Sequence, residues 1–180
     1  MTRRRALWTL GIASLVLFAG LLFLDRLMQD AGDAGIVDFE LAWTADRAGE
    51  IRAAWGEKGQ DAAELSLWLD FPYLLTYGLF LWLGARAMRD AALRRGWRGL
   101  ARPGGAIAVL ALVAAGCDVV EDVLLLVVLR GDDGEAAPAL AAGFASVKFL
   151  CLGIAALYLL GGLVALGVER LRRDAGEASA

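Results

Sequence analysis

Three acidic residues interrupt the third of four long apolar stretches in this sequence. The stretch spans residues 106–129 and contains Asp118, Glu121 and Asp122. An acidic residue at the centre of a membrane helix costs about 2.5–3.5 kcal/mol, so three cost roughly 8–10 kcal/mol, whereas the Val, Leu and Ile residues around them return only roughly 4–8 kcal/mol. The helix therefore needs protons, a cation or a partner side chain, and its acids mark a candidate functional site.

The four apolar stretches predict an all-α fold with four transmembrane helices. The chain has 180 residues, 59% of them hydrophobic, which is too apolar for a soluble domain and leaves no room for a second one. A bilayer core is spanned by about 20 apolar residues, and lipid leaves helices as the structure for such segments. We expect one integral membrane domain over residues 1–180, with transmembrane helices at 6–24, 64–86, 106–129 and 140–166.

The first stretch could also be a secretory signal peptide, because Arg3, Arg4 and Arg5 precede it. Its apolar run is longer than the usual 7–15 residues of a signal peptide, and no small-x-small cleavage site follows Leu24. We expect it to stay as an anchor.

The basic residues near the membrane ends predict the orientation. They precede the first helix, lie between the second and third, and follow the fourth: Arg3, Arg4, Arg5, Arg86, Arg89, Arg94, Arg95, Arg98, Arg102, Arg170, Arg172 and Arg173. The positive-inside rule predicts that both termini lie in the cytoplasm. The acidic loop 25–63 and the turn with Asp132, Asp133 and Glu135 lie outside. Topology explains the arginines, so we expect the lipid bilayer and not nucleic acid as partner, with oligomerisation left open.

The outer loop 25–63 contains one segment with the pattern of a short amphipathic helix. Thr44 is a suitable cap, and Ala48, Ile51 and Trp55 share one face. We expect this helix to lie on the outer membrane interface, with Trp43 and Trp55 at headgroup level. A lid over the bundle is the alternative.

The predicted orientation brings the charged residues of three helices to a similar depth. At 1.5 Å per residue, Asp70, Asp122 and Lys148 lie roughly 8–14 Å below the outer boundary, with Glu121 beside Asp122 and Asp118 about 6 Å deeper. Tyr73 and Tyr77 share the face of Asp70 on the second helix. We therefore predict one binding site in the outer half of the bundle, formed by Asp70, Tyr73, Tyr77, Asp118, Glu121, Asp122 and Lys148.

The absence of certain residues narrows the chemistry. The chain has no histidine, which removes His-ligated haem and zinc and Ser-His triads, and Cys117 and Cys151 fall within helices, where packing is the simplest role. No motif specifies a cofactor, and the sequence does not settle whether the protein is an enzyme.

Four segments resemble a group of small bacterial four-helix membrane proteins of unknown function. They are the Asp-Phe-x5-Tyr pattern from Asp70 to Tyr77, Asp118-x-x-Glu121-Asp122, and Phe144-x3-Lys148, together with Trp55-Gly56-Glu57-Lys58-Gly59. Asp122 stands where that group usually has asparagine and adds a negative charge. The resemblance implies the fold and a multi-pass location in the inner membrane of a bacterial cell, and it supplies no activity.

Four functions are compatible with this pattern. Four carboxyl groups around one ammonium favour a protein that binds or transports a cation or a cationic small molecule, with the tyrosines as cation–π walls. A cation or a small amphipathic ligand is the possible partner. A membrane enzyme acting on a lipid or isoprenoid, with the acids as proton donors or Mg²⁺ ligands, is the first alternative. The others are an accessory subunit and a salt-bridge network that only fixes helix register.

Overall fold

The computed structural model describes residues 2–131 and 134–177, so the predicted outer acids Asp132 and Asp133 lie outside the described residues. Within these ranges the chain is helical and contains no strand, which confirms the all-α fold. The helices are α1 (Arg3–Gly32), α2 (Ile36–Glu40), α3 (Ala45–Arg94), α4 (Arg98–Ala101), α5 (Gly104–Arg130) and α6 (Ala136–Glu177).

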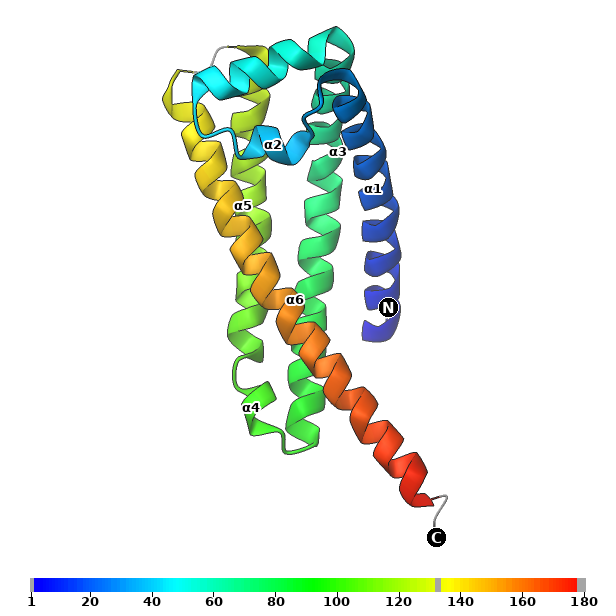
Figure 1. The fold of residues 1–180 in the computed structure, drawn as a ribbon. Helices are drawn as coiled ribbons and strands as arrows, with labels where there is room; N and C mark the ends of the chain where they lie inside the picture. The colour runs from blue at the N-terminus through cyan, green and yellow to red at the C-terminus, as the bar shows by residue number, and fades with distance from the viewer. Residues whose placement is uncertain (1, 132–133, 178–180) are drawn as a thin grey trace.

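The four long helices form an elongated bundle (Figure 1). α1 packs along α3, α3 packs along α5, and α5 packs along α6. In the figure, α6 crosses the others obliquely, and both ends of the chain point away from the end where α2 lies. The four predicted apolar segments each fall within a different long helix.

A single glycine divides α3 into two parts. Gly56 has φ 57° and ψ −165°, a backbone conformation that glycine adopts without the steric penalty of a side chain. The part before it, residues 45–55, is the predicted amphipathic helix, and the backbone N–H of Arg47 donates to Thr44 Oγ1 at 3.2 Å as expected of the cap. The helix resumes directly after Gly56, so α3 begins before the apolar segment 64–86 that it contains.

Trp55 does not face outward, as a side chain that contacts lipid headgroups would. Trp55 is 2% exposed, and its Nε1 donates to the Ala34 carbonyl at 2.7 Å. Its ring lies 5.0 Å from that of Phe39, while Trp43 is 52% exposed. The apolar face of residues 45–55 is therefore packed against the ends of the long helices. This packing removes the large indole of Trp55 from solvent.

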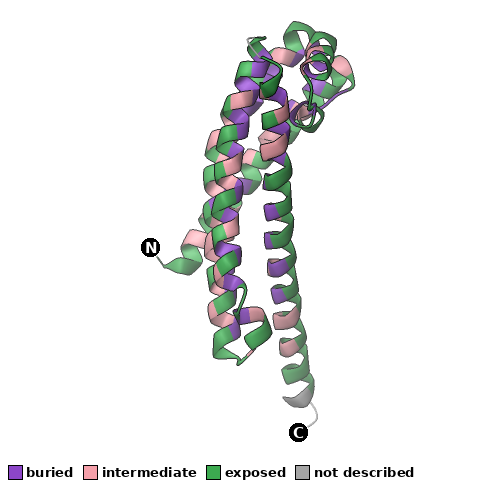
Figure 2. Cartoon of the chain, turned by 90° about the vertical axis from the view of Figure 1, so that its left-hand side faces the viewer, coloured by how far each residue is buried: buried purple, intermediate pink, exposed green. Residues whose placement is uncertain are grey.

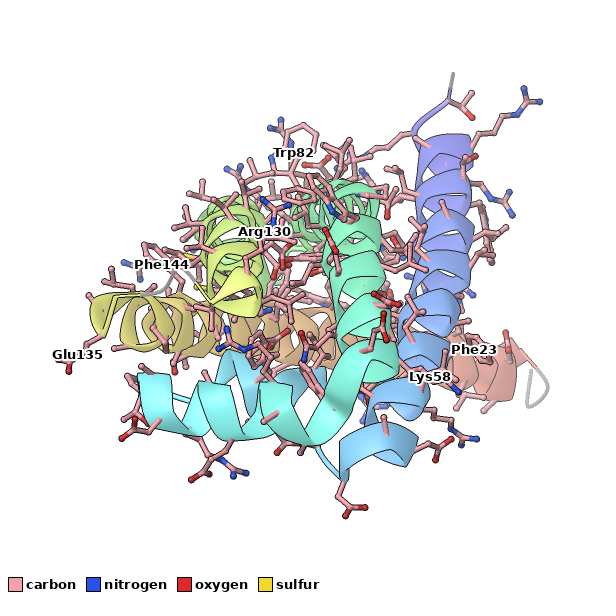
Figure 3. All side chains as sticks on the ribbon, turned by 90° about the horizontal axis from the view of Figure 1, so that it is seen from above. Phe23, Lys58, Trp82, Arg130, Glu135 and Phe144 are labelled. Atoms are coloured by element: carbon pink, nitrogen blue, oxygen red, sulfur yellow. The ribbon has the colours of Figure 1, made fainter. Side chains whose placement is uncertain are left out.

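We call α2 and residues 45–55 the cap. Seen from above in Figure 3, these segments lie across one end of the long helices. Asp25 of α1 accepts the backbone N–H of Ile36 at 2.7 Å, and Arg52 Nη1 donates to the Val128 carbonyl of α5 at 2.7 Å. These bonds attach both segments of the cap to the long helices.

The distribution of polarity is inverted relative to a soluble bundle. Ser66, Asp118, Glu121, Asp122 and Lys148 are buried, and large apolar side chains are exposed along the outer faces of all four long helices. Figure 2 shows buried residues on the facing sides of the helices and exposed ones on the outside. Among the described residues, two helices are long and apolar enough to cross a membrane, Arg3–Gly32 and Ala136–Ala175.

Candidate functional site

The bundle brings the seven predicted site residues into one neighbourhood just below the cap. Asp70, Tyr73 and Tyr77 come from α3, Asp118, Glu121 and Asp122 from α5, and Lys148 from α6. The spacing in the sequence explains the convergence, since residues three and four apart share one face of a helix. Burial is nearly complete for the three acids of α5, which are at most 2% exposed.

Lys148 is the ionic centre of this neighbourhood. Its Nζ lies 2.7 Å from Asp118 Oδ1 and 2.9 Å from Glu121 Oε1, and it donates a hydrogen bond to Glu121. Asp118 is also held from the other side, because Tyr77 donates its hydroxyl to Asp118 Oδ2 at 2.7 Å. Lys148, Asp118 and Glu121 therefore form a connected polar network between α5 and α6.

Glu40 also belongs to this network, although sequence reasoning placed it among the acids of the outer loop. Its Oε2 lies 3.5 Å from Lys148 Nζ, and the residue is 7% exposed. Burial raises the pKa of the Glu40 carboxyl, the Lys148 ammonium opposes this rise, and the Asp118 carboxylate adds to it. Its position at the end of the apolar segment Ile36-Val37-Asp38-Phe39 was the available signal, but five residues are too few to predict a helix that turns inward.

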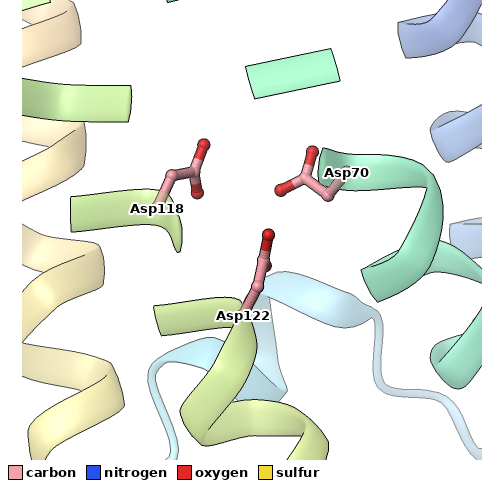
Figure 4. A group of neighbouring side chains, drawn as sticks. All are labelled: Asp70, Asp118 and Asp122. Atoms are coloured by element: carbon pink, nitrogen blue, oxygen red, sulfur yellow. The ribbon is translucent and has the colours of Figure 1, made fainter. Parts of the chain in front are cut away.

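Three aspartates form a second part of the site (Figure 4). Asp70, Asp118 and Asp122 each offer one carboxylate oxygen, and these oxygens lie within 4.8 Å of one another. In the figure the three side chains point into a common space from α3 and α5. Oxygen ligands of this kind suit hard cations such as Mg²⁺ or Ca²⁺.

Asp122 is the least satisfied of these acids. It is 1% exposed, and neither of its carboxylate oxygens accepts a hydrogen bond from a donor group among the described residues, although a proton could be shared with the neighbouring Asp70 carboxyl. A buried polar group without a partner costs about 1–3 kcal/mol, and more when it is charged. Asp122 therefore requires a proton, a water molecule or a bound cation.

The charges of the site do not balance. Five carboxyl groups, those of Glu40, Asp70, Asp118, Glu121 and Asp122, surround one ammonium group among the described residues. Lys148 lies within ion-pair distance of Glu40, Asp118 and Glu121. Asp70 and Asp122 form no ion pair with it. Once Asp70 and Asp122 are ionised, the arrangement attracts positive charge.

A cavity of about 370 Å³ adjoins the aspartates. Asp70, Asp118, Asp122 and Lys148 lie on its polar side. Its apolar walls come from α1, α2 and α6 and include Phe18, Leu21, Leu22, Ile36, Phe149 and Leu152. The site thus combines an acidic floor with hydrophobic sides.

The opposite half of the bundle is filled by small and apolar side chains. Ala85, Met88, Ile107, Ala108 and Ala155 form a buried cluster there. The acidic neighbourhood therefore has no counterpart at that end among the described residues. Cys117 and Cys151 are free cysteines within the long helices.

The resemblance seen in the sequence stays a prediction. Comparison with family models, curated proteins and solved structures found no match to this chain. Function is therefore argued from the geometry of the site.

Proposed function

We propose that this chain spans the inner membrane of a bacterium four times, with both termini in the cytoplasm. The inverted polarity supports this, because exposed apolar faces of this extent are stable in lipid and would aggregate in water. α1 begins and α6 ends away from the cap, and most arginines belong to the ends of the long helices opposite the cap, whereas Arg26, Arg47, Arg52 and Arg130 lie at the cap end. The packing of α1 along α3 favours a retained anchor over a removed signal peptide.

Reporter fusions test the orientation. Alkaline phosphatase inserted between α5 and α6, after residue 134, is expected to be active, and the same enzyme fused after residue 180 is expected to be inactive. The reverse pattern would place the cap and the site on the cytoplasmic side and refute the proposed topology.

We propose that the protein binds a cation in the acidic site between its helices. The observation that carries this proposal is Asp122, whose two buried oxygens have no partner in the described structure and which lies beside Asp70 and Asp118. A structural salt-bridge network explains Lys148 with Asp118 and Glu121, but it leaves Asp122 without a role. A cation is the ligand that satisfies all three aspartates together.

Binding fits the site better than conduction through the bundle. A conducting pore needs polar groups along its whole length, and the half opposite the cap is packed with Ala85, Met88, Ile107 and their neighbours. The ligand therefore enters and leaves in the half of the bundle where the site lies. Transport would need a rearrangement of the helices.

Cation binding is tested with the full chain in phosphatidylcholine nanodiscs. Thermal unfolding is measured with Mg²⁺, Mn²⁺, Ca²⁺, methylammonium and dodecylammonium for the wild type, Asp122→Asn and the exposed control Glu57→Gln. We expect at least one cation to raise the unfolding temperature of the wild type and of Glu57→Gln, but not of Asp122→Asn. Equal responses in all three proteins, or none, would refute the proposal.

An enzyme acting on a lipid or isoprenoid is the second candidate, favoured by the metal-like spacing of Asp70, Asp118 and Asp122 beside apolar walls. In that case Mg²⁺ would bind at the aspartates and hold a phosphate-bearing substrate. The test is Mg²⁺-dependent release of phosphate from a polyprenyl diphosphate. Release by the wild type that is lost in Asp70→Asn would support the enzyme.

A further inference from the structure

The rim of the cavity is made of exposed hydrophobic side chains. Phe18 and Leu22 of α1, Val37 of α2 and Phe149 of α6 all line the cavity, and they are 44%, 50%, 48% and 40% exposed. An opening surrounded by such residues is wetted by lipid more readily than by water. The site is therefore open towards the bilayer.

The arrangement of the helices explains this opening. α1 packs along α3, and α6 packs along α5. Within the described residues α1 and α6 make no extended packing with each other, yet residues of both line the cavity, together with residues of α2. Figure 1 shows α2 at one end of the bundle. The opening thus lies between two helices that each present an apolar outer face.

The size of the cavity exceeds what a single metal ion needs. About 370 Å³ falls in the range of roughly 300–1,000 Å³ that is typical of small-molecule sites. An ion held by Asp70, Asp118 and Asp122 would occupy only the polar end. The apolar walls of the cavity would then have no ligand group packed against them.

Aromatic rings connect the polar end with the rim. The rings of Tyr73 and Tyr77 lie 5.1 Å apart, and those of Phe18 and Tyr73 lie 5.9 Å apart. Faces of such rings attract organic ammonium groups. The row from Phe18 to Tyr77 leads from the rim to Asp118, which accepts the Tyr77 hydroxyl.

We infer that the ligand of this site is a protonated organic amine with an apolar body, which enters sideways from the bilayer between α1 and α6. The ammonium group lies against Asp122 and Asp70, which Lys148 leaves unneutralised, and the apolar body fills the space between α1 and α6. Lipids whose headgroups carry only negative charge are repelled by the same acids. This inference rests on the proposed cation site and adds the class of the cation and its route.

Matched probes test the amine and the apolar body separately. Dodecylamine, which is protonated at pH 7, is compared with dodecanol and with methylamine, and bound adducts are measured by native mass spectrometry of the full chain in phosphatidylcholine nanodiscs. Dodecylamine is expected to bind at least tenfold more tightly than either of the others. Asp122→Asn should weaken dodecylamine binding at least tenfold, and Glu57→Gln should leave it unchanged.

Filling the cavity tests the route. Leu152→Trp and Leu21→Trp each place a larger side chain in the apolar walls, so either is expected to weaken dodecylamine while leaving Mn²⁺ and methylammonium unaffected. Thermal unfolding of both variants shows whether each one folds. If one does not fold, the binding measurement uses the other. Unchanged dodecylamine binding in a folded Trp variant would refute the sideways route.

The outcomes separate this inference from the proposed function. If Mn²⁺ or methylammonium binds in an Asp122-dependent way but dodecylamine binds no more tightly, the amphipathic ligand is refuted and the cation site stands. If dodecanol binds as tightly as dodecylamine, the cavity recognises only the apolar body and the inference is refuted. If no probe depends on Asp122, both proposals are refuted.

Discussion

Replacing Lys148 by methionine removes the positive charge of the site while retaining a long apolar side chain. Nζ lies 2.7 Å from Asp118 Oδ1, 2.9 Å from Glu121 Oε1 and 3.5 Å from Glu40 Oε2, and Lys148 is 5% exposed. Lys148→Met therefore leaves three neighbouring carboxyl groups without their common partner. We expect a large loss of stability.

The distances give the magnitude. With an effective dielectric constant of about 20, unit charges 2.9 Å apart attract by roughly 6 kcal/mol, from which the desolvation of the ammonium subtracts several kcal/mol. Measured losses on removing one partner of a buried ion pair are about 3–5 kcal/mol. Lys148→Met should fall in this range, and adding Asp118→Asn should restore about 2 kcal/mol by removing one of the unpaired acids.

Reversible unfolding by sodium dodecyl sulfate in mixed micelles measures these free energies. Asp122→Asn serves as the contrast, because Asp122 has no hydrogen-bond donor among the described residues to lose, and an amide there should leave stability unchanged or raise it. A loss below about 1 kcal/mol for Lys148→Met would refute the account of the ionic centre. A loss in every acid-to-amide variant, Asp122→Asn included, would indicate a purely structural network.

Three further predictions concern the cap. Trp55→Phe should cost about 1–3 kcal/mol in the same unfolding assay, because the Ala34 carbonyl loses its buried donor, and an unchanged stability would contradict the role of this bond. Because the pKa of Glu40 is raised in the folded protein, the protonated carboxyl stabilises the fold below the usual carboxyl pKa of about 4.3, and this stabilisation is lost as the pH rises. Glu40→Gln should therefore become more stable relative to the wild type from pH 5 to pH 8. A variant that becomes less stable relative to the wild type over this range would contradict the raised pKa. A Cβ on Gly32 would lie 2.7 Å from the Ala54 backbone, so Gly32→Ala should destabilise by about 1–3 kcal/mol, while Gly49→Ala, with open space around it, should not; thermal unfolding of both compares them.

The long helices and the convergence of the charges were predictable because both depend on periodicity and on the cost of charge in lipid. Asp118, Glu121 and Asp122 must face inward on a lipid-exposed helix, and the charge of Lys148 makes it their natural partner. These arguments need only distances along helices. They do not need the connections between them.

The cap was less predictable because its parts are short and its position depends on contacts distant in sequence. Trp55 is typical of a membrane interface when considered alone, and only the Ala34 carbonyl and the Phe39 ring show why it is buried. A single residue with positive φ, Gly56, is enough to turn the chain between residues 45–55 and the rest of α3. Glu40 was missed because α2 has five residues and little periodicity.

The length of α6 has a consequence for handling the protein. Its 42 residues extend over about 63 Å, roughly twice the hydrocarbon thickness of a bilayer, and in Figure 1 its last turns project beyond the other helices. An affinity tag or fluorescent protein attached there is carried on a stiff helical spacer, far from the cavity. Immobilisation through this end should leave the site free for ligand measurements on a surface.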